Sequence, residues 1–278
     1  MRRIFSIFTI AAFIGLCLPA QSQAQSRFTF RLAGGLNMLD GGDLNTGAEG
    51  WFNSWETLAH HGGYGTSGEF SPAKLGLNFS GDFIFKFNES LGVGIGAGML
   101  SASKESVMTV SGVGGGDATH QIKASAVPLR LGLFYYLPIG PTMNVVFNAG
   151  LGYYLAKANF TMILTGAGTS TVEFDTSGGG IGFHGGLGLE IALGSNLGIL
   201  VDLSGRFASF AGFEGKQIND GTTMSGKLWA FDSSSYLGNF HAIIVQAPTP
   251  SGPGISHAAE AKVSFTGFSL VAGFFFRF

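Results

Sequence analysis

The stretch SFTGFSLVAGFFFRF, residues 264–278, ends the chain and decides the fold, because two kinds of residue alternate along it. One set is apolar throughout: Phe268, Leu270, Ala272, Phe274, Phe276 and Phe278. The other set is mixed and mostly small, with Ser269, Val271, Gly273, Phe275 and Arg277. Alternation with a period of two is typical of a β-strand that has one apolar face. That face needs an apolar partner, which is either a protein core or a lipid bilayer.

The same alternation recurs in seven earlier segments. Residues 75–87 carry it most clearly, with Leu and Phe on one face and Gly, Asn, Ser, Asp and Lys on the other. The remaining segments are residues 27–37, 91–99, 127–137, 145–155, 181–193 and 199–207. Each is about 10 residues long, the length that a tilted strand needs to cross the hydrocarbon layer. The chain therefore has eight strands in this interpretation.

The connections between these strands alternate in length. Short turns lie at residues 88–90, 138–142 and 194–196, whereas long loops span about 38–74, 105–119, 161–178 and 211–262. Short periplasmic turns and long extracellular loops are typical of an outer-membrane barrel with an even strand number and both termini in the periplasm. We predict an all-β fold, an eight-stranded antiparallel up-and-down transmembrane β-barrel, whose first and last strands pair so that no edge remains.

A soluble β-sandwich or a lipocalin-like barrel is the alternative fold. It would turn the apolar faces inward and leave a surface made largely of glycine. The composition argues against this, because charged residues are only 12% of the chain while Gly reaches 46 and Phe 27 of 278 residues. Small and charged residues instead suit the narrow lumen of an eight-stranded barrel.

The N-terminus has the pattern of a secretory signal peptide. Met1-Arg2-Arg3 is a positive start, residues 4–18 are apolar, and Ser22-Gln23-Ala24 supplies small residues for cleavage. The apolar run is shorter than the ~20 residues of a membrane-spanning helix. We expect residues 1–24 to be the signal peptide and residues 25–278 to be the barrel domain, integral to the cell outer membrane. Cleavage removes Cys17, the only cysteine, and leaves a net charge of 13 − 17 = −4, which excludes a nucleic-acid partner.

Several motifs make the chain resemble a known family, the small outer-membrane β-barrel proteins related to opacity and adhesin-type surface proteins. The motifs are VPLRLGLFYYL at 127–137, NAGLGYY at 148–154, GGLGLE at 185–190 and the terminal aromatic Phe278. The resemblance implies a membrane barrel in contact with outer-membrane lipid. It also implies that Phe274, Phe276 and Phe278 carry the signal that the barrel-assembly machinery reads. It identifies a fold and not an activity.

Ionisable residues on the predicted inward faces form the first candidate site. They are Arg31, Asp82, Lys86, Arg130, Glu190, Asp202, Arg206 and Arg277, with His184 nearby. We expect the five basic and three acidic groups to interlock, because one buried charge left unpaired costs about 3–5 kcal/mol. A proton or ion path is the alternative role, and a wide pore is not expected in a barrel this small.

Aromatic residues in the loops form the second candidate site. Trp51 and Trp55 lie in residues 47–61, whose helical spacing predicts a short amphipathic helix that lies over the barrel mouth, lies at the membrane interface, or packs on other loops. Trp229, Phe231 and Tyr236 lie in the fourth loop, where we expect a hairpin extension. An extracellular ligand would bind here, although the sequence does not identify it. Pro128 removes a ladder hydrogen bond, which predicts a bulge.

Histidines give little support for an enzyme or a metal site. His60-His61, His120, His241 and His257 lack the spacing of a zinc site, and none is part of the His-x-Ser pair that lipid A deacylases use. We expect no cofactor and no enzymatic activity. The sequence favours a structural or adhesion-type surface protein. The alternatives are a transporter that takes small hydrophobic molecules through the barrel mouth with lateral release, and a lipid-hydrolysing enzyme.

Overall fold

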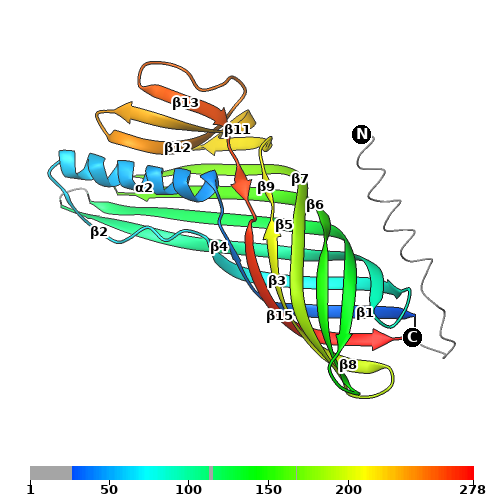
Figure 1. Ribbon diagram of the computed structural model, residues 1–278. Coiled ribbons are helices and arrows are strands. Elements are labelled where there is room, and N and C mark those ends of the chain that lie inside the picture. The colour runs from blue at the N-terminus through cyan, green and yellow to red at the C-terminus, as the bar shows by residue number, and fades with distance from the viewer. Residues whose placement is uncertain (1–26, 113–114, 167) are drawn as a thin grey trace.

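Eight strands close into an antiparallel ring in the computed structural model, which describes residues 27–112, 115–166 and 168–278 (Figure 1). The predicted signal peptide lies outside these residues. The ring consists of β1 (Phe28–Leu39), β3 (Leu75–Lys86), β4 (Leu91–Ser111), β5 (Gly116–Pro138), β6 (Met143–Thr165), β7 (Thr169–Ala192), β8 (Leu197–Phe207) and β15 (Gly267–Arg277). Each strand pairs with the next, and β15 pairs with β1. The predicted barrel is confirmed.

The terminal strand presents its apolar face to the outside of the ring. Phe268 is 65% exposed and Phe274 is 53% exposed, whereas Val271 and Phe275 on the opposite face are buried. Its neighbours in register are also apolar on the outside, since Leu36 pairs with Leu270 and Phe30 pairs with Phe276. This continuous apolar belt is the surface that a barrel shows to lipid.

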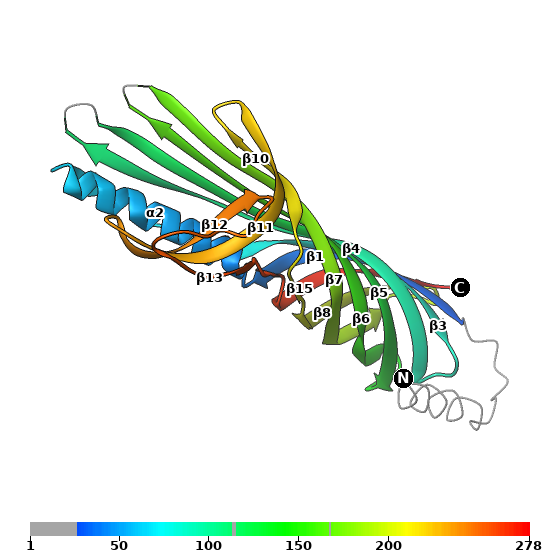
Figure 2. The same cartoon turned by 90° about the horizontal axis from the view of Figure 1, so that it is seen from above.

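The strands of the ring differ in length by about a factor of two. β4, β5, β6 and β7 contain 21 to 24 residues, while β1, β3, β8 and β15 contain 11 or 12. The four long strands therefore continue past the apolar belt as a curved sheet (Figures 1 and 2). The loop expected at residues 105–119 is wrong, because residues 105–111 belong to β4 and residues 116–119 belong to β5. The hairpin extension expected in the fourth loop is confirmed, because residues 222–235 and 238–246 form two paired antiparallel strands.

The polarity of the long strands inverts above the belt. On β5 the outward residues from Val127 to Leu137 are apolar, whereas the outward residues above them are Ser125, Lys123 and Gln121. The inward residues change in the opposite sense, from charged and small in the lumen to the buried Ile122. The upper sheet thus has its apolar side inside and its polar side toward water, as in a soluble protein.

Shorter elements complete this upper region, which we call the extracellular domain together with the upper parts of β4–β7. They are α2 (Asp43–His61), β2 (Gly65–Ser67), β9 (Ser209–Phe210), β10 (Glu214–Asn219), β11 (Thr222–Ser235), β12 (Gly238–Gln246), β13 (Ile255–Glu260) and β14 (Val263–Ser264). β10 pairs with β7, and β11 and β12 extend the sheet. α2 lies along the concave side (Figure 2). Among the described residues no helix combines the length and apolarity needed to span a membrane.

α2 begins at Asp43, four residues before the predicted start, and packs closely against the edge of β12. A Cβ atom on Gly50 would lie 1.7 Å from the carbonyl oxygen of His241, and one on Gly47 would lie 2.5 Å from Ile243. The indole nitrogen of Trp51 donates a hydrogen bond to the carbonyl of Ile243 at 3.0 Å. The helix thereby covers a strand edge that would otherwise be open to pairing with another chain.

Pro128 does not produce the expected bulge. Pairing between β4 and β5 stops after Ala97–Leu129 and resumes at Leu100–Ala126 in the same register. No residue is inserted in either strand across this gap, so the missing N–H of Pro128 interrupts the ladder without a shift. On its other side Pro128 stays in register with Tyr154 of β6.

Candidate functional site

An ion-pair network fills the periplasmic half of the lumen, and Arg31 lies at its centre. Its Nη2 atom donates a hydrogen bond to Asp202 Oδ2 at 3.1 Å, and its Nε atom lies 3.7 Å from Glu190 Oε1. Arg277 Nη2 donates to the other oxygen of Glu190 at 3.0 Å. These residues come from β1, β7, β8 and β15, so the network joins strands from both ends of the chain across the barrel closure.

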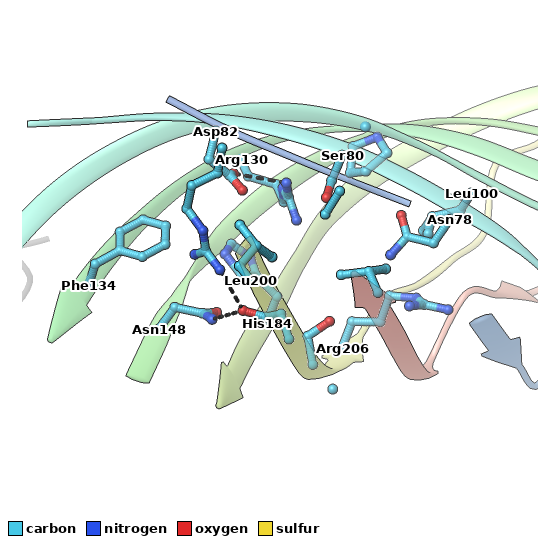
Figure 3. Close-up of a pocket in the computed structure, with 18 of the residues that line it drawn as sticks. Asn78, Ser80, Asp82, Leu100, Arg130, Phe134, Asn148, His184, Leu200 and Arg206 are labelled. Carbon is cyan, nitrogen blue, oxygen red and sulfur yellow. Dashed lines mark hydrogen bonds and ion pairs between the residues drawn. The ribbon is translucent and has the colours of Figure 1, made fainter. Parts of the chain in front are cut away.

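A second ion pair lies beside this group. Arg130 Nη2 donates to Asp82 Oδ1 at 2.8 Å, and Asn148 donates to Asp202 Oδ2 at 3.3 Å (Figure 3). The expected interlocking therefore holds for Arg31, Asp82, Arg130, Glu190, Asp202 and Arg277, which we call the lumen network. Both Arg31 and Glu190 are almost completely buried. Removal of one partner from such a buried pair leaves an uncompensated charge and destabilises the fold.

Two of the predicted basic residues have different partners, which corrects the expectation that all eight groups interlock. Lys86 Nζ lies 3.7 Å from the centre of the Tyr136 ring, a cation–π contact. Arg206 is bound by neutral oxygens, namely the carbonyls of Phe265 and Met38, the side chain of Asn37 and the hydroxyl of Ser269. Within the described residues neither cation has an acidic partner within 4 Å.

The lumen itself is nearly full. A cavity of about 50 Å³ lies between Arg31, Arg130, His184 and Arg206, with Leu200 and Phe134 in its wall (Figure 3). That volume accommodates a few water molecules and no larger ligand. His184 borders this cavity, and its Nδ1 atom is buried without a hydrogen-bonding partner among the residues that the structure describes.

An apolar cluster lies beside the lumen cavity, where the barrel meets the extracellular domain. Tyr154, Phe210 and Phe265 are in successive ring contact, with ring centres 5.6 Å apart for the first two and 6.4 Å apart for the last two. All three belong to the same buried cluster as Leu39 and Ala208. Tyr154 also lines the lumen cavity, so this apolar cluster adjoins the cavity.

The predicted loop aromatics are distributed over the extracellular domain and do not form one site. Trp51 anchors α2, and Trp229 Nε1 donates to the carbonyl of Gln246 at 3.0 Å. Phe231 is 8% exposed and belongs to the core, whereas Tyr236 at the β11–β12 turn is 74% exposed. Trp55 lies on the other half of α2, beside a surface groove.

Sequence reasoning missed a cluster of two histidines and two carboxylates in the extracellular domain. Asp232 on β11 is hydrogen-bonded through one oxygen to His241 Nδ1 at 2.9 Å and through the other to His257 Nδ1 at 2.8 Å. Hydrogen bonds from His241 and His257 lower the pKa of Asp232 below its usual value. His241 Nε2 lies 3.8 Å from Asp43 Oδ1 at the start of α2. Across the described part of the chain no three such side chains are arranged to hold a metal ion.

His120 lies beneath α2 in the core of the extracellular domain. Its ring is completely buried between Phe52 and Phe160, with centroid distances of 5.3 Å and 5.9 Å. Burial lowers the pKa of His120 to about 4, because the apolar surroundings disfavour the charged ring. The alternation of residues along β5 places the His120 ring inward. Part of its apolar surroundings comes from Phe52, which lies on α2.

Comparison with known proteins gives the family. The structure of OprG from Pseudomonas aeruginosa covers 93% of this chain and 99% of its own length, with 14% identity and a TM-score of 0.38. Ail, the attachment invasion locus protein of Yersinia pestis, covers 90% and 99%, with 11% identity and a TM-score of 0.35. No curated protein matches. The family model described as outer membrane protein beta-barrel domain matches residues 8–226. The chain therefore belongs to the outer membrane protein beta-barrel domain family, and its location is the outer membrane.

Proposed function

We propose that this chain is a non-enzymatic surface protein whose extracellular domain binds partners outside the cell, in an adhesion-type role. One observation carries the proposal: the extracellular domain has a packed core of its own, while the lumen below it holds a cavity of only about 50 Å³. A folded domain on a filled barrel suits presentation of a surface better than passage of a solute.

The outward side of the upper sheet supports the same role. Gln121, Lys123, Lys157 and Asn159 project from β5 and β6 toward water, on the upper parts of strands that pair there with both neighbours. A rigid scaffold with exposed polar groups binds with little loss of conformational entropy. The exposed ring of Tyr236 adds an amphipathic contact of the kind enriched at interfaces.

Adherence of cells that display the protein tests this proposal. A non-adherent Gram-negative host would produce the wild type, the Gly50→Val variant, or no protein, and its binding to epithelial cells and matrix proteins would be counted. We expect several-fold greater adherence with the wild type, and loss with Gly50→Val, which displaces α2 while the barrel stays inserted. Equal adherence of all three strains, with surface exposure verified, would contradict the proposal.

Transport of small hydrophobic molecules with lateral release is the second candidate. It is favoured by the gap in the β4–β5 ladder, because Gly98 and Pro128 in this gap also line the lumen cavity. A disulfide between Met99→Cys and Val127→Cys, which face each other across the gap, would lock it. Uptake of an apolar probe by cells that stops on oxidation and returns on reduction would support transport, and uptake unaffected by the lock would refute it.

A lipid-hydrolysing function has less support. The His241–Asp232 pair has the geometry of a base and its orienting carboxylate, but Nε2 of His241 faces Asp43 and not a hydroxyl group. The expected result of a phospholipid and lipid A hydrolysis assay on the folded protein is no release of fatty acid.

Recognition by the barrel-assembly machinery is proposed for the terminal strand. Phe274, Phe276 and Phe278 all lie on the lipid face, and Phe278 contacts Phe28 of β1 at a ring distance of 6.3 Å. Deletion of Phe278 is expected to lower the amount of inserted protein in cells, measured by heat-modifiable migration in outer-membrane fractions. Refolding of the same variant in detergent should remain efficient, and unchanged insertion in cells would contradict this role.

A further inference from the structure

The lumen contains more positive than negative charge. All three of its carboxylates, among the described residues, are in ion pairs with Arg31, Arg130 and Arg277. The other two inward cations have no carboxylate of their own. Lys86 lies at the periplasmic end of β3 against the Tyr136 ring, whereas Arg206 lies near the extracellular end of β8. The surplus positive charge is therefore divided between the two ends of the lumen.

Arg206 carries its charge in a buried place. The residue is only 6% exposed, and its guanidinium group donates hydrogen bonds to two backbone carbonyls, one amide oxygen and one hydroxyl oxygen. These neutral acceptors satisfy its N–H groups and leave its positive charge uncompensated. A buried charge is unfavourable unless an opposite charge lies close to it. Arg206 therefore favours the entry of a negative charge into its surroundings.

The lumen cavity of about 50 Å³ is the space beside this charge. Its wall contains three arginines and two aspartates, namely Arg31, Arg130, Arg206, Asp82 and Asp202. Asp82 is already paired with Arg130, and Asp202 is already paired with Arg31. The wall thus keeps one net positive charge, that of Arg206. Protonation of His184, which also lines the cavity, would only add to it.

Free hydrogen-bond donors line the same cavity. Asn78 is only 6% exposed, and its amide has no hydrogen-bonding partner among the described residues. The amide points from β3 toward the other side chains of the cavity wall (Figure 3). Its atoms remain accessible from the cavity, in contrast to Nδ1 of His184, which is shut off. The hydroxyl groups of Ser80 and Ser204, in the same wall, also bond to no described residue.

From these observations we propose that the lumen cavity binds one halide-sized inorganic anion, which compensates the charge of Arg206 and accepts hydrogen bonds from Asn78 and the neighbouring serines. Water fits the same space but does not compensate a charge. The volume, which holds a few water molecules, excludes a larger anion. The inference is independent of adhesion, because that role concerns the extracellular domain. It is equally independent of transport, since a resident anion requires no passage of an apolar solute.

Bromide is the probe for the position of the anion, because it resembles chloride in charge and size and is identified by its anomalous scattering. Crystals of the folded protein would be grown from detergent in sodium bromide, and diffraction would be measured at the bromine absorption edge. We expect an anomalous peak inside the lumen, in contact with Asn78 and on the side of Arg206. An adventitious ion only, with peaks confined to the outer surface, or a lumen that holds only water would overturn the inference.

Thermal unfolding in detergent tests the role of the charge. The unfolding midpoint, followed by heat-modifiable migration, should be higher in sodium chloride than in sodium gluconate of equal ionic strength, because gluconate is too large for the cavity. We expect a difference of about 3–6 °C when chloride is present at ten times its dissociation constant. Arg206→Met should abolish this difference. Lys86→Met is the matched control, because it removes the other unpaired cation, which does not line the cavity, and should leave the difference unchanged.

Asn78→Leu tests the cavity while Arg206 and its hydrogen bonds stay in place, and it decides the matter if Arg206→Met does not fold. This variant should weaken chloride binding about 10-fold or more, because a hydrogen bond to a charged group is lost. A chloride effect that persists in full in Asn78→Leu and Arg206→Met would overturn the assignment to this cavity. Its loss in Lys86→Met would do the same, because total lumen charge would then attract the anion. Unchanged migration of the unheated protein verifies that each variant is folded.

Discussion

The transmembrane barrel and the extracellular domain are built from the same strands with opposite polarity. In the barrel, apolar side chains such as Leu131 face outward and ion pairs such as Arg31–Asp202 fill the inside. In the extracellular domain, Gln121 faces outward and Ile122 is buried inside. The same paired strands therefore run from lipid into water. The polarity of the outward side chains indicates whether lipid or water surrounds each part of a strand.

The largest expected effect comes from the inside of the barrel. Replacing Arg31 with Met leaves Glu190 and Asp202 buried without their main partner, so we expect a loss of about 3–5 kcal/mol in unfolding free energy. Urea unfolding in lipid vesicles measures this loss. Lys123→Met on the exposed outer face is the control and should change stability by less than about 0.5 kcal/mol. A small loss for Arg31→Met would mean that the lumen network is not held by charge.

A lysine introduced at two positions on the outer face of β5 distinguishes the part of the strand that faces lipid from the part that faces water. Leu131→Lys puts a charge on the lipid face and should cost about 2–4 kcal/mol near the bilayer midplane. Gln121→Lys lies on the same face of the same strand, above the belt, and should be nearly neutral. Unfolding in vesicles compares the two variants, and equal costs would contradict the inversion of polarity.

Acidification is expected to weaken the extracellular domain more than the barrel. The pKa of His120 is about 4 when folded and about 6.5 when unfolded, so the unfolded state binds more protons between these values. Stability present above pH 6.5 is therefore lost as the pH falls, by about 2 kcal/mol at pH 5. Protease cleavage of α2 in vesicles at pH 7.5 and pH 5 measures this loss. His120→Leu should remove the dependence, and a pH response that survives this substitution would assign it to other groups.

The smallest expected effect concerns the contact between α2 and β12. Gly50→Ala should destabilise the extracellular domain by about 1–3 kcal/mol, because the new Cβ atom collides with the carbonyl of His241. Helix propensity alone predicts the opposite sign, a gain of about 1 kcal/mol. Glu49→Ala, one residue away on the exposed side, is the matched control. Protease resistance of α2 that rises with Gly50→Ala would show that the helix is not closely packed there.

The sequence predicted the barrel because its belt alternates strongly, as Leu129, Leu131 and Leu133 do against Arg130 and Gly132. It did not predict the upper parts of β4 and β5. On β5 the apolar residues occupy even positions up to Ala126 and odd positions from Val127 onward. A change of phase resembles the end of a strand, and the inward alanines above it are only weakly apolar. The strands continue because their backbone pairing does not depend on which face meets lipid.

The candidate site, like the fold, was predicted in part from the sequence. Inward alternation placed Arg31, Glu190 and Asp202 in the lumen, where they form ion pairs as expected. Arg206 could not be assigned its partners, because Phe265 reaches it from the segment between β14 and β15 and Asn37 reaches it from β1. The Asp232–His241 pair depends on the register of β11 and β12, which no turn motif in the fourth loop defines.

Cysteine labelling tests the inversion of polarity most directly, since Cys17 in the predicted signal peptide is the only native cysteine. Gln121→Cys and Leu131→Cys would be produced separately in cells and treated with a membrane-impermeant maleimide. The inversion predicts rapid labelling at residue 121, which faces water, and no labelling at residue 131, which faces lipid. Labelling of both residues, or of residue 131 alone, would contradict it.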